Sequence, residues 1–387
     1  MNKEDANNRP TVVIANGIMD AGGTETLIME MLRNRFGRVN YIMLIHYMGH
    51  ITEGIFDAEI RELGIPIVYI PSVGTVGIRG YIREFQKEIE KIGHVDIIHS
   101  NLNANGGVIA MAAKMAGIKH RICHCHADIC YKGSFIHRMK EEAQLLLLKL
   151  LIGRYATDRW ACSEAAWHRL FFGNRGKVVI PNMIDVSKYL STPEKIHTAK
   201  KRWNMDNTLV LGSVGRVAPI KNYELALRVT AVMNKNTDTH FICFGRFNEK
   251  DPYCGSLLSL ANLLGIADKV HFVGNSNQVS SDIHCIDVFM MPSTTEGFGM
   301  AAIEAQAAGL PTLLSEGVPR LVDVNIGLAH FLPAGDADAW VRCIEEGQTE
   351  RKKSAEEIVR HFDEKGFNSK TATLAIENKY IQILNKQ

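Results

Sequence analysis

Short apolar runs rich in β-branched residues alternate with helix-like segments along the first half of the chain. The run TVVIAN (11–16) predicts a buried strand, and DAGGTETLIMEMLRNRF (20–36) predicts a glycine turn that opens a helix. The same pattern predicts further strands at 41–46, 65–70, 95–100, 119–126, 158–163 and 177–181. Since helix-like segments separate most of these runs, we expect a parallel sheet covered on both faces.

The alternation weakens over the polar stretch that ends at Asn207, and it restarts with TLVLGSVGR (208–216). Further apolar runs predict strands at 239–245, 269–274, 287–293 and 310–315. We therefore predict an α/β protein with a first domain at 1–185, a linker at 186–207 and a second domain at 208–367. Two doubly wound domains that face each other would bind a ligand at the carboxyl ends of their strands.

Length and composition agree with two soluble domains. The chain has 387 residues, which is too long for one ordinary domain, and 46% of them are hydrophobic, which is enough for real cores. The net charge of +2 gives no strong field for nucleic acid, which we exclude as a partner. We find no signal peptide and no apolar run of the roughly 18 residues that span a bilayer. The eight scattered cysteines suggest reduced thiols and a cytoplasmic location.

The stretch TTEGFGMAAIE (294–304) places two carboxylates around a glycine turn at a predicted helix start. Free N–H groups at a helix start suit a phosphate, and glycines let a ligand approach the backbone. Glu304, inside the helix, is suited to accept hydrogen bonds from the two hydroxyls of a ribose, and Glu296, on the loop, from those of a sugar. The alternative is a loop glutamate and a helix-surface glutamate without function.

Two further segments favour the same kind of ligand. In GSVGRVAPIKN (212–222), Arg216 and Lys221 follow a strand end and are suited to neutralise a diphosphate, unless they are simply solvated surface cations. In the first strand–helix turn, Gly22 and Gly23 are suited to bring backbone N–H groups to the same phosphates, although such a glycine pair is often only structural.

The segment RICHCHADIC (121–130) contains three cysteines and two histidines. Strand alternation predicts Cys123 and Cys125 on one face and His124 and His126 on the other, which argues against zinc. We expect His126 at the carboxyl end of its strand, beside the ligand; the alternative is a structural histidine.

Two other motifs are weaker. GFGMAA (297–302) matches a dinucleotide fingerprint but lies late in the chain and apart from the strand's apolar body. Asp336 and Asp338 mimic a metal site, but we expect them to cap the helix that follows.

Taken together, GRVAPIKN, VHFVGNSNQV, DVFMMPSTTEGFGMAAIEAQAAGLP and RICHCHAD with the downstream ACSEAAWHRLFFG and VVIPNMID resemble family 4 of the retaining glycosyltransferases, especially bacterial enzymes of capsule and exopolysaccharide assembly. The resemblance covers about residues 11 to 345, and its most specific element is the Glu-x7-Glu motif. It implies a GT-B fold, in which two Rossmann-like domains face each other across a cleft. It also implies that the last helix, about 368–387, packs back on the N-terminal domain.

By position, the resemblance implies that Glu304 holds the ribose, that Glu296 holds hydroxyls of the transferred sugar, and that Arg216 and Lys221 grip the diphosphate. It also places Phe298, Gly299 and Met300 against the donor, and His126 near the donor sugar's 6-hydroxyl. Two departures stand out: CFGRFNEKDPYC (243–254) lacks the family's Gly-Asp/Glu-Gly, and Cys125 replaces a common serine.

We therefore predict a retaining hexosyltransferase that moves a sugar from a nucleoside diphosphate donor, such as a UDP-sugar, to an acceptor hydroxyl on a glycan or a lipid-linked molecule. No metal or other cofactor is expected, because two fixed cations replace a divalent ion. The alternatives are a nucleotide-sugar epimerase of the same fold and an NAD-dependent oxidoreductase that uses GFGMAA. The leucine-rich, basic segment 131–160 predicts peripheral contact with the inner face of the membrane, unless its leucines are core.

Overall fold

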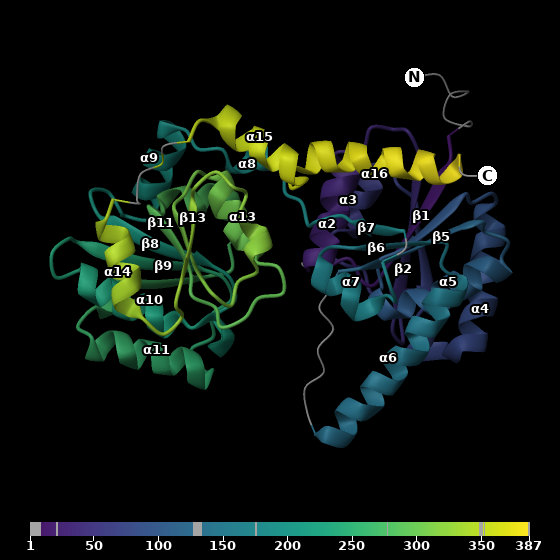
Figure 1. Ribbon diagram of the computed structural model, residues 1–387, viewed down its shortest axis with the longest axis horizontal. Helices are drawn as coiled ribbons and strands as arrows, with labels where there is room; N and C mark the ends of the chain where they lie inside the picture. The colour runs from purple at the N-terminus through teal and green to yellow at the C-terminus, as the bar shows by residue number, and fades with distance from the viewer. Residues whose placement is uncertain are drawn as a thin grey trace. The chain divides into compact units, whose positions relative to one another are not determined.

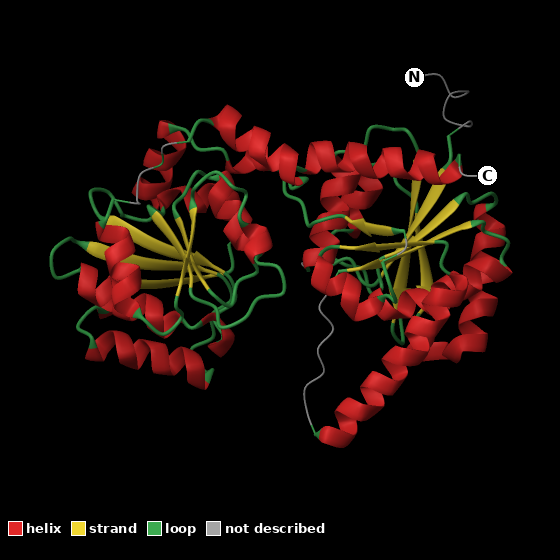
Figure 2. Cartoon of the chain, viewed as in Figure 1, coloured by secondary structure: helices red, strands yellow, loops and turns green. Residues whose placement is uncertain are grey.

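The computed structural model describes residues 9–20, 22–126, 134–174, 176–276, 278–347, 351 and 353–385. It divides the chain into two compact units, Met1–Ile184 with Ser369–Gln387, and Asp185–Asn368. Each unit is a parallel sheet with helices on both of its faces (Figures 1 and 2). The predicted α/β class, with two doubly wound sheets, is confirmed.

The first unit contains a seven-stranded sheet in the order β3-β2-β1-β4-β5-β6-β7. Its strands are β1 (Thr11–Asn16), β2 (Asn40–Tyr47), β3 (Ile67–Pro71), β4 (Ile97–Ser100), β5 (His120–Cys125), β6 (Asp158–Ala161) and β7 (Lys177–Val179). Its helices are α2 (Gly23–Arg33), α3 (Asp57–Glu62), α4 (Val73–Ile92), α5 (Gly106–Met115), α6 (Phe135–Tyr155), α7 (Glu164–Leu170) and α16 (Ser369–Leu384), with a short 3₁₀ turn, η1 (Asn103–Asn105).

Alternate residues of β1 explain why helices cover both faces of this sheet. Val12 and Ile14 belong to a core that includes apolar residues of α2 and α16, whereas Val13 and Ala15 belong to a second core with residues of α4 and α5. A strand whose residues are buried on both sides reads as a continuous apolar run, which is how the sequence pattern identified it.

The second unit contains a six-stranded sheet in the order β10-β9-β8-β11-β12-β13. Its strands are β8 (Leu209–Val214), β9 (Thr239–Phe244), β10 (Val270–Gly274), β11 (Val288–Met291), β12 (Thr312–Ser315) and β13 (Ala329–Leu332). Its α-helices are α8 (Val186–Tyr189), α9 (Pro193–Arg202), α10 (Tyr223–Met233), α11 (Pro252–Leu263), α12 (Val279–Asp282), α13 (Met300–Ala307), α14 (Ala337–Glu345) and α15 (Ala355–Lys365). Short 3₁₀ turns are η2 (Pro219–Lys221), η3 (Ala267–Lys269), η4 (Ile283–Cys285) and η5 (Arg320–Val322).

The sequence pattern located every strand except β13, which we did not predict. The strand β13 has only four residues, AHFL, and includes His330, so it gives no continuous apolar run like that of β1. The predicted linker at 186–207 is wrong. This segment begins with α8 and α9 and belongs to the second unit. The helix α9 was missed because its sequence, PEKIHTAKKR, is mostly polar and buries only Ala199.

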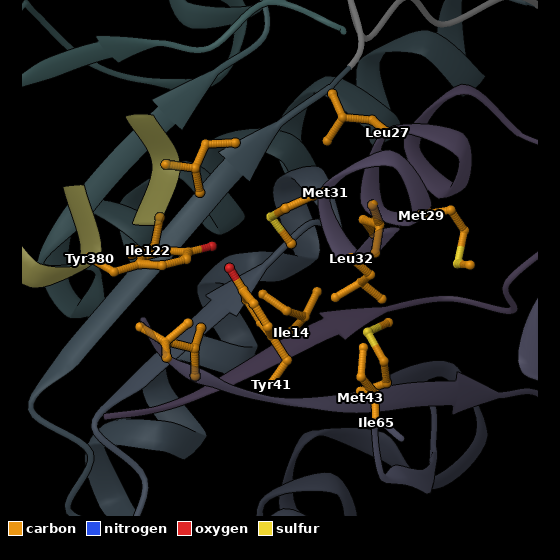
Figure 3. Close-up of a cluster of buried hydrophobic side chains, with 14 of the residues drawn as sticks. Ile14, Leu27, Met29, Met31, Leu32, Tyr41, Met43, Ile65, Ile122 and Tyr380 are labelled. Atoms are coloured by element: carbon orange, nitrogen blue, oxygen red, sulfur yellow. The ribbon is translucent and has the colours of Figure 1, made fainter. Parts of the chain in front are cut away.

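The C-terminal helix α16 belongs to the first unit and packs beside α2. Asn34 at the end of α2 donates to Ser369 Oγ at 3.1 Å, and the backbone N–H of Phe36 donates to Glu377 Oε1 at 3.2 Å. Tyr380 lies in the same apolar cluster as Ile14 and Tyr41 (Figure 3). The described part of α16 thus completes one face of the first unit, as the resemblance implied.

Candidate active site

The strand order of the second unit brings together two segments of the predicted donor site. The order reverses between β8 and β11, which are neighbours in the sheet although 73 residues separate the end of β8 from the start of β11. The loop after β8 carries Arg216 and Lys221, and the loop after β11 carries Glu296. Backbone N–H of Thr294 donates to the carbonyl of Ile220 at 2.8 Å, so the two loops are joined directly. Ligands of open α/β sheets bind at such a switch point.

Lys221 and Glu296 form an ion pair at this position. Lys221 Nζ donates to Glu296 Oε1 at 2.6 Å, and the side chains are 20% and 13% exposed. Ser293 Oγ donates to the same oxygen at 2.6 Å. Lys221 and Glu296, which were predicted to bind adjacent parts of one ligand, therefore lie side by side. Ser293, which the sequence did not point to, holds the carboxylate in place.

Arg216, the other predicted cation, has a different environment. Its side chain is exposed, and within the described residues it makes no hydrogen bond or ion pair. It lies five positions before Lys221, in a loop that starts where β8 ends at Val214. Its guanidinium is thus available to a ligand at little cost, because no contact within the protein has to be broken.

Glu304 lies on α13, one turn inside the helix that follows the glycine turn. Burial raises the pKa of its carboxyl group from 4.5 to about 6, and a hydrogen bond with Tyr189 opposes that rise. Tyr189 is the last residue of α8, in the segment that we predicted as a linker. Tyr189 is a second contributor that the sequence reasoning missed, since nothing in the local pattern places α8 against α13.

The glycine turn before α13 has a conformational role. Gly299 is the N-cap of α13 with φ of 95°, in the left-handed region that favours glycine, and a Cβ there would lie 3.3 Å from Val322 Cγ1. Phe298 is 8% exposed, and its ring packs edge-on against Phe367 with centroids 5.9 Å apart. Phe298 therefore anchors the loop in the core, and Met300 is the first residue of the helix.

In the first unit, His126 follows β5 at the carboxyl end of the strand, as expected. Its backbone N–H donates to Asn103 Oδ1 at 2.7 Å, and its Nε2 lies 2.7 Å from Asn101 Oδ1. Burial lowers the pKa of His126 to about 3, so the ring is neutral at pH 7. The predicted alternation is confirmed, because Cys123 and Cys125 lie in one apolar cluster while His124 stacks on His99, away from it.

Gly22 and Gly23 lie at the start of α2, also in the first unit. A Cβ on Gly22 would overlap the Glu25 carboxylate, which accepts a hydrogen bond from Asn16 Nδ2 at 3.1 Å. The place that suits an anion at this helix start is thus next to a carboxylate of the chain itself. A phosphate would need Glu25 to move, so the role of Gly22 and Gly23 stays a prediction.

The two weaker motifs have structural explanations. Asp336 Oδ1 accepts a hydrogen bond from the backbone N–H of Ala339 at 3.1 Å and caps α14, which confirms the capping prediction for Asp336, whereas Asp338 lies in the first turn of the helix. GFGMAA does not join a strand directly to a helix, because residues 292–299 separate β11 from α13. That spacing differs from the dinucleotide fingerprint, in which the glycines follow the strand at once.

Three comparisons with known proteins bear on these residues. Residues 195–361 match the family model described as "Glycosyl transferases group 1". This match covers most of the second unit. The matched range contains every predicted site residue of the second unit, from Arg216 and Lys221 to Glu296 and Glu304.

Similarity to curated proteins extends beyond this matched range. The chain is 28% identical to EpsF of Bacillus subtilis (strain 168) over 371 residues, which cover 94% of each chain. It is 26% identical over 231 residues to an Escherichia coli enzyme named UDP-Gal:alpha-D-GlcNAc-diphosphoundecaprenol alpha-1,3-galactosyltransferase, covering 57% of each chain. These relatives and the domain support glycosyl transfer as the activity.

A solved structure shows the fold. HepE of Anabaena, crystallised in complex with UDP, superposes with a TM-score of 0.78 over 98% of this chain and 100% of its own, at 18% identity. The chain thus has the GT-B fold. The predicted site residues divide between its two units: Gly22, Gly23 and His126 belong to the first, and the remainder belong to the second.

Proposed function

We propose that this chain is a retaining glycosyltransferase that moves a hexose from a UDP-sugar to an acceptor hydroxyl in bacterial cell-surface polysaccharide synthesis. The observation that carries the proposal is the contact between Lys221 Nζ and Glu296 Oε1 at the switch point of the second unit. A nucleoside diphosphate-sugar presents sugar hydroxyls, a diphosphate and ribose hydroxyls in that order. Glu296, Lys221 with Arg216, and Glu304 match these three groups chemically.

UDP is our choice of nucleotide for two reasons. The Escherichia coli relative is named for UDP-Gal, and the HepE structure contains UDP. Both proteins are distant, so the base and the sugar are tested directly: thermal-shift or ligand-observed NMR screening of UDP-, GDP- and ADP-sugars should select UDP-sugars. Preference for another base would contradict this part of the proposal.

In the proposed reaction, negative charge grows on the diphosphate as the bond to the anomeric carbon breaks. Lys221 and Arg216 stabilise that charge, which removes the need for a divalent cation. The acceptor hydroxyl attacks from the face that the nucleotide leaves, and a phosphate oxygen of the donor takes its proton. His126, neutral because its pKa is lowered, orients the sugar and is not the main base.

A test of the reaction combines donor, acceptor and EDTA. The product's anomeric configuration, read by NMR coupling constants, should equal that of the donor. An inverted product would contradict retention, and conversion of the donor sugar without any acceptor would point to an epimerase.

We also propose that the acceptor is lipid-linked and that α6 brings the enzyme to the membrane. No helix among the described residues is both long and apolar enough to cross a bilayer. On α6, however, Leu145 and Ile152 are buried while six large apolar side chains are 51–70% exposed. These six are Phe135, Ile136, Met139, Leu146, Leu147 and Leu150. The leucine run is therefore only partly core; residues 131–133 of the predicted contact segment lie outside the described residues.

The spacing of these six residues places them on one side of the helix. At 100° per residue they fall within an arc of about 120°, and the exposed cations Lys140 and Arg154 lie within or beside that arc. Of the two acidic residues of α6, Glu142 is paired with Arg169. An apolar stripe bordered by cations suits an anionic lipid surface. The diphosphoundecaprenol-linked substrate named for the Escherichia coli relative would lie at such a surface.

Vesicle sedimentation tests the membrane contact. The protein should sediment with vesicles that contain phosphatidylglycerol, and Leu147→Glu with Leu150→Glu should abolish this without changing UDP binding. The control is Leu263→Glu, because Leu263 is an 84% exposed leucine of the second unit. Equal sedimentation of the α6 variant and the control would contradict the role of α6.

A further inference from the structure

A line of buried rings joins the C-terminal helix α16 to His126 within the first unit. Tyr380 Oη lies 2.6 Å from His99 Nδ1, and His99 Nε2 lies 3.1 Å from His124 Nδ1. The His124 ring packs against the His126 ring, with centroids 3.9 Å apart. Trp160 stacks on Tyr380 and holds its ring in place, with centroids 5.6 Å apart.

The protonation state of this line follows from burial. His99, His124 and Tyr380 are at most 3% exposed. Burial lowers the pKa of His99 to about 3, lowers that of His124 well below its usual range, and raises that of Tyr380 well above 10. At pH 7 each imidazole therefore carries one N–H, and the tyrosine keeps its hydroxyl hydrogen. The hydrogen bonds between Tyr380 and His99 and between His99 and His124 then allow only two arrangements of donors and acceptors.

The count of unsatisfied groups decides between these directions. If Tyr380 donates to His99 and His99 donates to His124, one buried group lacks a partner, the N–H at His124 Nε2. If the bonds run the other way, His124 Nε2 becomes a bare acceptor and the Tyr380 hydroxyl hydrogen has no acceptor among the described residues. Nearby Glu377 already accepts from Tyr41 and from two backbone N–H groups. Fewer buried polar groups are left unpaired in the first direction, which we adopt.

His126 at the end of the line is held by two kinds of contact. Its Nε2 donates to Asn101 Oδ1, which leaves Nδ1 as a bare acceptor without a partner in the described chain. Its ring face lies on His124, whose own orientation depends on the bond to His99. A change at Tyr380 is therefore transmitted to the surface on which His126 packs.

We propose that Tyr380, on the C-terminal helix, is a positioning residue for His126: its hydroxyl fixes the tautomer of His99 and His124 and so the ring that supports His126. The effect on catalysis rests on the proposed function, in which His126 orients the transferred sugar. The effect on the tautomer is independent of that function, because the tautomer is a property of the free protein.

The test uses the full-length protein labelled with ¹⁵N at histidine, with long-range ¹H–¹⁵N correlation spectra to locate each N–H. Wild type should show His124 protonated on Nε2. Tyr380→Phe keeps the ring and its packing but removes the hydroxyl, so neither tautomer is favoured and the His124 signals should shift toward a mixture. The matched control is Tyr41→Phe, which removes another buried hydroxyl bonded to α16, through Glu377, but lies outside the line.

Kinetics with a UDP-sugar give the second readout. Tyr380→Phe should lower kcat about three- to tenfold, which corresponds to the loss of one hydrogen bond. The UDP affinity of Tyr380→Phe should stay at the wild-type value, and so should the kinetics of Tyr41→Phe. Protonation of wild-type His124 on Nδ1, an unchanged tautomer in Tyr380→Phe, or a changed tautomer with unchanged kcat would each overturn the proposal. If the tautomer changes as expected but no nucleotide-sugar is turned over, the hydrogen-bonded line from Tyr380 to His124 is supported and the proposed function fails.

Discussion

Replacing Glu304 with glutamine should stabilise the free protein and weaken its complex with the nucleotide. Burial raises the pKa of this carboxyl group from 4.5 to about 6. Between these two pH values the folded protein binds more protons at this site than the unfolded chain does, so stability falls as pH rises through the window. Above about pH 6 the whole penalty is present. The rise of the pKa from 4.5 to about 6 corresponds to about 2 kcal/mol, an upper value because the residue keeps part of its surface exposed.

Glutamine has the same shape but no charge to bury. Glu304→Gln should therefore match wild type at pH 4.5 and exceed its stability by up to about 2 kcal/mol at pH 7.5. Binding should change in the opposite sense. Hydrogen bonds from ribose hydroxyls to a carboxylate are worth about 1.5–3 kcal/mol, so affinity for a UDP-sugar should fall about tenfold or more.

The control is Glu296→Gln, the other carboxylate of the same motif. Glu296 is paired with Lys221 at 2.6 Å, and both side chains are largely buried. Removing its charge leaves the ammonium group without its partner, which should cost about 1–3 kcal/mol, somewhat less than for a fully buried pair. The two glutamine variants should thus shift stability at pH 7.5 in opposite directions.

Urea denaturation at pH 4.5 and 7.5 measures the stability terms, and calorimetric titration at pH 7.5 measures the affinity. The diphosphate of a UDP-sugar is esterified at both ends, so its charge is constant over this range. Destabilisation by Glu304→Gln at pH 7.5, or an equal gain at both pH values, would refute the argument from burial. An unchanged affinity would refute the assignment of Glu304 to the ribose.

Three further predictions concern the same unit. Lys221→Ala should lower kcat about a hundredfold and raise the donor KM. Arg216→Lys should keep only part of the wild-type activity, because an ammonium group cannot replace the planar guanidinium group. An effect on KM alone would show that these residues bind the ground state and the transition state equally. Activity should survive EDTA without added Mg²⁺ or Mn²⁺, and complete loss that one metal restores would contradict a metal-free mechanism. Tyr189→Phe should raise the pKa of Glu304 further, since the hydrogen bond from Tyr189 opposes the rise. Donor affinity should then fall more at pH 6 than at pH 8. An equal loss of affinity at both pH values would show that protonation of Glu304 is not the cause.

The sequence allowed the fold to be predicted because several of its strands are buried on both faces. Such strands give continuous apolar runs, as in β1 and β11, whereas the four residues AHFL of β13 do not. The helix α9 was missed for a related reason: only Ala199 is buried, so a polar surface helix resembles a linker. Helical periodicity depends on an apolar face, and a helix that buries one small residue hardly shows one.

The sequence allowed the residue types of the candidate site and their positions in loops to be predicted, but not their contacts. Glu296, Lys221 and Arg216 were each predicted from a loop after a strand, but the ion pair joins residues 75 positions apart. That pairing follows from strand order, since β8 and β11 are neighbours only because the order reverses between them. The contact between Tyr189 and Glu304 depends likewise on tertiary packing, of α8 and α13.

The ion pair also explains why two oppositely charged residues are useful in the absence of a donor. Lys221 alone would be a largely buried cation, and Glu296 alone a largely buried anion. Each is costly without a partner, so their contact lowers the free energy of the empty site. In the proposed complex the diphosphate becomes an additional partner of Lys221, and sugar hydroxyls become partners of Glu296. The pair therefore keeps both groups desolvated and in place before the donor arrives, which reduces the reorganisation that binding and reaction require.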